Sequence, residues 1–171
     1  MTKKYISYFA PLILFVAFLI DGQLSTLLIN WAPDRVIIAS HLLLMAGIFL
    51  TQYLPISYMI VLFTLLGLSY DLYYLGVLGI ATTLFPLMAY IVYYFHQELG
   101  FKRITNLILL LVLVFGFEFT SFLFARLFHM TNLSMFIFVF YNLVPTLVFN
   151  FLLLLIFQPL FERFFGITNK T

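Results

Sequence analysis

The stretch Tyr5–Trp31 reads YISYFAPLILFVAFLIDGQLSTLLINW and is almost entirely apolar. As a helix rising about 1.5 Å per residue, it is long enough to cross the roughly 30 Å hydrocarbon core of a bilayer. Lys3-Lys4 and the apolar residues behind them are similar to the start of a secretory signal, but Asp21-Gly22-Gln23 is a poor small-residue cleavage site. We therefore expect an uncleaved first membrane helix.

The composition extends this expectation to the rest of the chain. Of the 171 residues, 65% are apolar and 8% are charged, and the mean hydropathy is +1.17. A soluble domain carries about 25% charged residues. With about 20 residues per membrane helix, the chain has room for about six transmembrane helices and no separate soluble domain. The composition predicts an all-α integral membrane protein with a single polytopic domain, residues 1–171.

Charged and turn-forming residues divide the apolar sequence into segments. The expected segments are residues 5–31, 36–52, 56–72, 75–95, 106–125 and 133–157. Lys and Arg accumulate in the cytoplasmic loops of membrane proteins. With six crossings, one side holds Lys3, Lys4, Lys102, Arg103, Arg163 and Lys170, and the other holds Arg35 and Arg126. We therefore expect a multi-pass protein of the cytoplasmic membrane with both termini in the cytoplasm.

Three carboxylates and an amide fall inside these segments: Asp21, Asp71, Glu118 and Asn142. A carboxylate in a membrane helix costs about 2.5–3.5 kcal/mol on insertion scales, so it needs a protein-facing or hydrated position. One hypothesis is an outward-facing pocket or partner site formed by these residues with Gln23. The alternative is structural, with Asp71 capping a turn and Glu118 leaning towards Arg126. Gly22 beside Asp21 permits a local break in the helix, which favours a buried contact for Asp21.

Small residues recur along the fourth segment at Gly76, Gly79, Thr83 and Pro86. Spacings of three, four and three put them on one helical face, which predicts close helix packing. After the sixth segment, Pro159 starts either a short amphipathic surface helix or a continuation of the same helix.

Several function classes lack sequence support. Cysteine is absent, which excludes disulfides and thiolate sites. His41, His96 and His129 share no metal-ligand spacing, so we expect no metal site and no cofactor. A net charge of +2 is too small to indicate nucleic-acid binding. No phosphate-binding loop, nucleophile elbow or zinc signature is present in the sequence.

The stretch Gly67–Gly79, GLSYDLYYLGVLG, resembles the central signature of the rod shape-determining protein MreD family. That signature has a glycine four residues before an aspartate and a leucine-glycine pair entering the next helix. The resemblance extends in length and overall organisation over essentially the whole chain. Tyr70, Tyr73 and Tyr74 are not part of the family pattern, so the resemblance implies no role for them.

The resemblance implies a multi-pass, non-catalytic component of the cell-wall elongation machinery. Such a component binds the membrane helix of the bitopic protein MreC and couples it to the peptidoglycan synthase complex. It also implies a fold similar to the substrate-binding subunits of energy-coupling-factor vitamin transporters.

Three functions compete on these grounds. The first is an interaction scaffold in the membrane lipid, as the resemblance implies. The second is a solute-binding subunit of a vitamin-type transporter, with Asp21, Asp71 and Glu118 lining a pocket. That class usually carries an Ala-x-x-x-Ala face on its first helix, whereas Ala10 and Ala17 are seven apart here. The third, a membrane-embedded enzyme, needs a convergent acid–base cluster that three scattered carboxylates support poorly.

Overall fold

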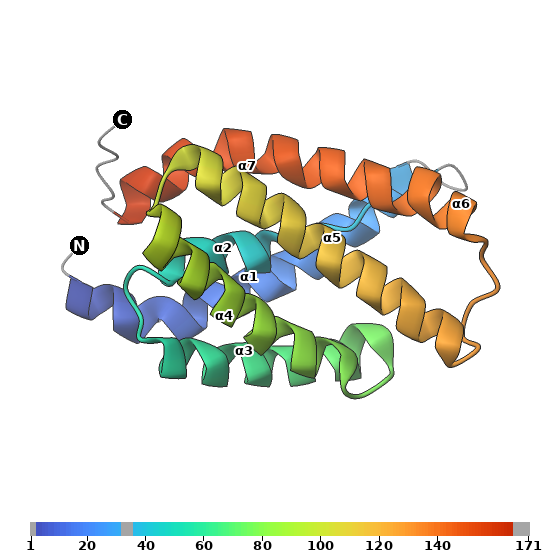
Figure 1. Ribbon diagram of the computed structural model, residues 1–171, viewed down its shortest axis with the longest axis horizontal. Coiled ribbons are helices and arrows are strands. Elements are labelled where there is room, and N and C mark those ends of the chain that lie inside the picture. Colours follow the sequence, from blue (N-terminus) through green and yellow to red (C-terminus); the bar gives the residue numbers. More distant parts are fainter. Residues whose placement is uncertain (1–2, 32–35, 166–171) are drawn as a thin grey trace.

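The computed structural model describes residues 3–31 and 36–165 and is helical almost throughout that part of the chain (Figure 1). The elements are α1 (Lys3–Trp31), α2 (Leu42–Leu50), α3 (Ile56–Tyr70), the π-helical turn η1 (Asp71–Leu75), α4 (Ile80–Leu99), α5 (Arg103–Leu127), α6 (Met135–Phe138), the π-helical turn η2 (Val139–Leu143) and α7 (Val144–Phe165). Because η1 continues α3, and α6, η2 and α7 form one unbroken helix, the elements make six rods. The expected turn at 32–35 and Lys170 lie outside the described residues.

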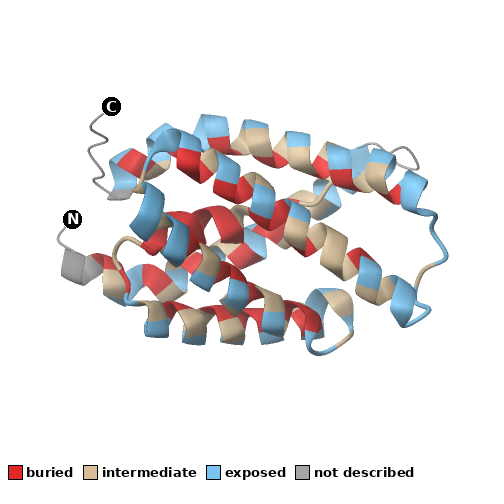
Figure 2. Cartoon of the chain, in the orientation of Figure 1, coloured by how far each residue is buried: buried red, intermediate tan, exposed pale blue. Residues whose placement is uncertain are grey.

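The rods alternate in direction, and both termini lie at the same end of the bundle (Figure 1). Among the described residues, four helical stretches are long and apolar enough to cross a membrane: Ile6–Trp31, Ile56–Leu75, Arg103–Leu127 and Met135–Phe164. Their outward faces carry exposed apolar residues such as Leu65, Val112 and Val148, while buried residues line the faces turned towards the interior (Figure 2). Apolar side chains on the outer face suit contact with lipid, so the protein is an all-α integral membrane protein.

The second rod is shorter than the expected segment 36–52. Helix α2 covers only Leu42–Leu50, and residues 36–41 before it have no regular secondary structure. Eight of its nine residues, Leu43 to Leu50, are buried. A helix that is apolar on all sides is a buried helix, so α2 lies in the centre of the bundle with its neighbours around it.

The fourth rod begins at Ile80, later than expected. The prediction of one packing face of small residues along it is therefore wrong. Gly76 and Gly79 lie in the turn before α4, with φ angles of 65° and 113°, and a β-carbon at either would meet no atom within 4 Å. They supply the left-handed backbone that the turn requires. Thr83 is exposed and bonds back to the Gly79 carbonyl, and Pro86 lies half-buried within α4. These four residues therefore do not form one packing face.

The close approach of α3 and α4 occurs instead at Gly67. A β-carbon there would lie 2.5 Å from the Ala81 carbonyl oxygen and 2.8 Å from the α-carbon of Thr82. Since backbone atoms cannot move aside as a flexible side chain can, Gly67 is the residue that lets these two helices touch.

The last rod continues past Pro159. Helix α7 runs to Phe165 with Pro159 inside it, so no separate surface helix starts at this proline. Of the two possibilities that the sequence left open after Pro159, the structure therefore shows the continuation of the sixth segment.

Candidate functional site: a buried polar cluster at the start of α2

The segment 36–41 leads into α2 without regular secondary structure, so its backbone lacks the hydrogen-bond partners that a helix provides. Asn150 of α7 provides hydrogen-bond partners for this backbone. Its Oδ1 accepts from the His41 backbone nitrogen at 2.9 Å, and its Nδ2 donates to the Ala39 carbonyl at 2.7 Å. Thr146, one turn earlier, accepts from the Ala39 nitrogen at 3.1 Å. Non-helical backbone at membrane depth is tolerated only where protein satisfies it, and α7 supplies that here.

Helix α1 and η2 hold the same segment from other sides. The Ser25 hydroxyl accepts from the Ser40 backbone nitrogen at 2.9 Å, and the Ile37 nitrogen donates to the Tyr141 carbonyl at 2.8 Å. The segment is thus fixed by α1, η2 and α7 together, and it sets where α2 can begin.

Asp21 of α1 caps the first turn of α2. Its carboxylate accepts from the Leu42 and Leu43 backbone nitrogens at 2.6 and 2.8 Å and from the Ser40 hydroxyl at 2.6 Å. The first N–H groups of a helix lack intrahelical partners and carry a partial positive charge, which a carboxylate stabilises. The side chain is buried, at 5% exposure, so the hypothesis of a buried contact for Asp21 is confirmed.

Glu118 of α5 pairs with His41, the residue before α2. Its Oε1 lies 2.9 Å from Nε2 of His41, whose ring also packs edge-on against Phe117. The contact is an ion pair when the imidazole is protonated and a hydrogen bond from Nε2–H otherwise. Glu118 therefore faces the bundle interior and contacts His41, not Arg126 as the structural alternative had it.

Asp71 caps the first turn of α4 in the same way as Asp21 caps α2. Its Oδ1 accepts from the Ala81 nitrogen at 2.7 Å, and its Oδ2 accepts from the Gly79 nitrogen at 2.8 Å and from the nitrogen and hydroxyl of Thr82 at 3.0 and 2.6 Å. The side chain is fully buried. The hypothesis that Asp71 caps a turn is confirmed, and the turn is the α3–α4 connection.

The three carboxylates consequently do not meet in one pocket. A cavity of about 200 Å³ beside the cluster is lined by Asp21, Ser25, Ser40 and Tyr70 among others, but by neither Asp71 nor Glu118. Gln23 is exposed and lies outside this lining. Asn142 Oδ1 is buried without a hydrogen-bond partner in the described structure.

A second polar cluster, at the end where the termini lie, was not predicted from the sequence. Arg103 at the start of α5 donates from Nε and Nη2 to Glu162 of α7 at 3.0 and 2.7 Å, and Gln158 donates to the same carboxylate at 3.3 Å. Nearby, His96 contacts Thr51 and Asn106 at 3.0 and 3.1 Å. The spacing of Gln158 and Glu162, four residues apart on one helical face, was the available signal.

The polar side chains of both clusters form hydrogen bonds with backbone or side-chain groups of the protein itself. Among the described residues, no group of three or more His, Asp or Glu side chains could hold a metal ion. The hydrogen bonds made by Asp21 and Asp71 occupy both oxygens of each carboxylate. Chemically, the arrangement fixes the start of two helices.

Comparison with known proteins agrees with the resemblance seen in the signature stretch. The family model described as rod shape-determining protein MreD matches residues 4–167. The cell shape-determining protein MreD of Streptococcus pneumoniae (strain ATCC BAA-255 / R6) is 37% identical over 166 residues, covering 95% of this chain and 97% of the relative. No solved structure matches.

Proposed function

The chain belongs to the rod shape-determining protein MreD family, and from this premise we propose that it is a non-catalytic scaffold of the bacterial cell-wall elongation machinery. In this proposal it binds the membrane helix of MreC and links it to the peptidoglycan synthase complex. It acts as a single polytopic domain of the cytoplasmic membrane, with both termini in the cytoplasm.

The observation that carries the proposal is the internal use of the intramembrane carboxylates. Asp21 and Asp71 cap helices, and Glu118 pairs with His41. A catalytic acid or base must reach a substrate atom, and these groups are turned to the fold instead. What the described protein offers to other molecules in the membrane is a surface of exposed apolar helix faces, which suits contact with another membrane helix.

A solute-binding role is the second candidate, because Asp21 does line a cavity. That cavity has a volume of about 200 Å³, whereas small-molecule sites usually have roughly 300–1,000 Å³. Its carboxylate is also engaged by Ser40, Leu42 and Leu43. Size and chemistry both favour the scaffold over the transporter subunit.

Purification of the tagged protein in mild detergent tests the proposal. We expect a single-pass protein with a large extracellular portion to co-purify. A tagged membrane protein of another family serves as the control and should not retain this single-pass protein. A vitamin-sized molecule bound to the purified protein, with no single-pass partner, would establish the transporter alternative. Hydrolysis of a lipid-linked cell-wall precursor by the purified protein would contradict the non-catalytic role.

A further inference from the structure

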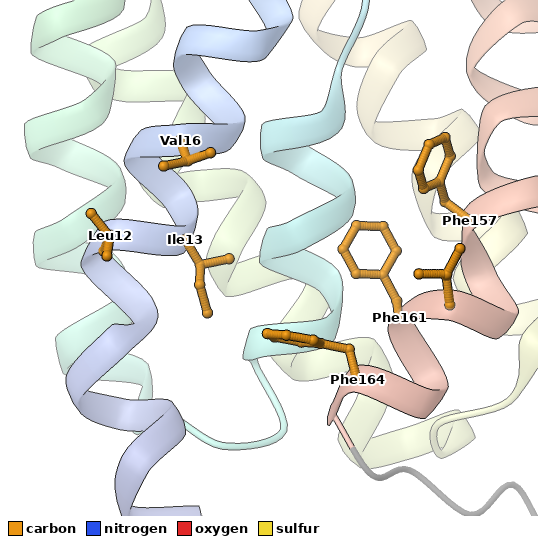
Figure 3. Close-up of a pocket in the computed structure, with 7 residues that line it drawn as sticks. Leu12, Ile13, Val16, Phe157, Phe161 and Phe164 are labelled. Atoms are coloured by element: carbon orange, nitrogen blue, oxygen red, sulfur yellow. The ribbon is translucent and has the colours of Figure 1, made fainter. Parts of the chain in front are cut away.

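An apolar groove runs between α1 and α7 at the end of the bundle where the termini lie. It has a volume of about 410 Å³, and its lining includes Leu12, Ile13 and Val16 from α1 and Phe157, Phe161 and Phe164 from α7 (Figure 3). A smaller hollow of about 150 Å³, which shares Ile13 and Phe164 with it, continues along α1 to Phe9 and Ile6. Every residue of both linings is a hydrocarbon side chain.

Each wall of the groove is fixed by a different neighbour, so the groove is a built feature of the fold. On α7, Glu162 is held by Arg103 of α5, and the Phe161 ring stacks on Phe49 of α2 with ring centroids 5.0 Å apart. On α1, Ala10 and Leu14 are completely buried in the core. Neither wall needs an occupant to keep its place.

The length of the groove indicates the kind of occupant. From Ile6 to Val16 the groove follows α1 for about 15 Å at 1.5 Å per residue, which is half of the roughly 30 Å hydrocarbon core. A membrane helix crosses the whole core, whereas the acyl chain of a lipid occupies one leaflet. The groove therefore fits a chain from the leaflet on the side of the termini.

Charge at the mouth of the groove indicates the head group. Arg163 lies exposed in the last turn of α7. This turn of α7 and the start of α1 lie at the same end of the bundle (Figure 1), so Arg163 puts a basic side chain at the end of the groove. The nearby carboxylate of Glu162 is already paired with Arg103. Basic residues between membrane helices attract anionic lipid head groups.

We propose that the groove between α1 and α7 binds an anionic phospholipid, with an acyl chain between the helices and the phosphate beside Arg163 at the end of α7. This lipid site is independent of the scaffold function proposed above, because it does not involve the partner.

Tryptophan quenching by brominated lipid tests the site. The chain has one tryptophan, so Trp31→Phe gives a protein without tryptophan fluorescence. In this background, Val16→Trp places a tryptophan in the groove, and Phe15→Trp places one beside the groove, facing the bilayer. Val16 and Phe15 are similarly exposed, at 44% and 48%, which makes them a matched pair. In phosphatidylcholine vesicles, we expect brominated phosphatidylglycerol to quench Val16→Trp more strongly than an equal fraction of brominated phosphatidylcholine, and to quench Phe15→Trp no more strongly. Leu12→Trp, a second groove position, should behave as Val16→Trp does.

Removal of the mouth charge tests the head-group contact. Arg163→Gln should weaken the preference for phosphatidylglycerol about fivefold, the effect of one basic residue near an anionic surface. Lys102→Gln, which neutralises an exposed basic residue in the α4–α5 connection, should leave the preference unchanged. Equal quenching of Val16→Trp by the two lipids would overturn the proposal. Absence of quenching at both groove positions, with normal quenching of Phe15→Trp, would also overturn it, in favour of a protein occupant.

Discussion

Asp71 accepts a 2.7 Å hydrogen bond from the backbone nitrogen of Ala81, ten residues along the chain, and so holds the first turn of α4 against the start of η1. Asp21 does the same for α2 through Leu42, at 2.6 Å. In both cases one helix supplies a carboxylate to the start of the next helix, which runs in the opposite direction. An intramembrane charge is thereby neutralised by helix-terminal N–H groups rather than by a cation.

Asp71→Asn should lower the stability of the protein. Asparagine has an NH₂ group in place of one carboxylate oxygen. That NH₂ group would face backbone N–H donors, either that of Ala81 or those of Gly79 and Thr82, and two donors cannot form a hydrogen bond. An unsatisfied buried donor costs about 1–3 kcal/mol, and we expect a loss of that size in thermal unfolding in detergent. Ser69→Ala is the control, because the exposed Ser69 hydroxyl bonds only to the carbonyl of Leu65 within its own helix. An asparagine variant as stable as the native protein would show that the charge on Asp71 serves something other than the cap.

Gly67→Ala should be destabilising because the added methyl group meets the Ala81 carbonyl oxygen at 2.5 Å. Gly116→Ala in α5 is a matched control, since its methyl group would meet only the Met88 methyl carbon at 3.9 Å. Alanine is favoured over glycine in a helix by about 1 kcal/mol, so the control should be neutral or slightly more stable. Melting temperatures of the two variants give the comparison, and equal tolerance of both changes would contradict the close approach of α3 and α4.

Glu118 and His41 should show energetic coupling. Glu118→Leu removes the acceptor of His41 Nε2 and leaves a buried imidazole nitrogen without its partner, while Glu118→Gln retains an oxygen at the same place. We expect the leucine variant to be less stable than the glutamine variant. A double-mutant cycle with His41→Phe should give a coupling energy of about 0.5–3 kcal/mol, as residues in contact usually do. Additive effects would mean that the pair contributes nothing to the fold.

The two ends of the bundle should be labelled from opposite sides of the membrane. The chain contains no cysteine, so single cysteines can be placed in exposed connections without a background, at Lys102 between α4 and α5 and at Asn132 between α5 and α6. An impermeant thiol reagent should label Asn132→Cys in intact cells and Lys102→Cys only after lysis. Labelling of both in intact cells would rule out the proposed orientation.

Composition and apolar runs were sufficient for the membrane class and for the long helices α1, α3, α5 and α7. They do not reveal that α2 is half-length, because Val36-Ile37-Ile38-Ala39 is as apolar as a membrane helix. In a bilayer, core-facing and lipid-facing residues are both apolar, so periodicity carries little information on which face is buried. The small-residue stripe beginning at Gly76 failed for a local reason: α4 starts only after the left-handed Gly79.

By itself, the sequence determined that the chain is an all-α membrane protein, that its few carboxylates need protein partners, and that Gly67–Gly79 resembles the MreD signature. These follow from transfer free energies and local spacing, which depend on residues close together in the chain. Only the tertiary structure decided which partners the carboxylates have, since Glu118 and His41 are 77 residues apart and Arg103 and Glu162 are 59 apart. Such pairs form because buried polar groups must be satisfied by whichever helix packs beside them, and the choice of neighbour is a property of the packed bundle.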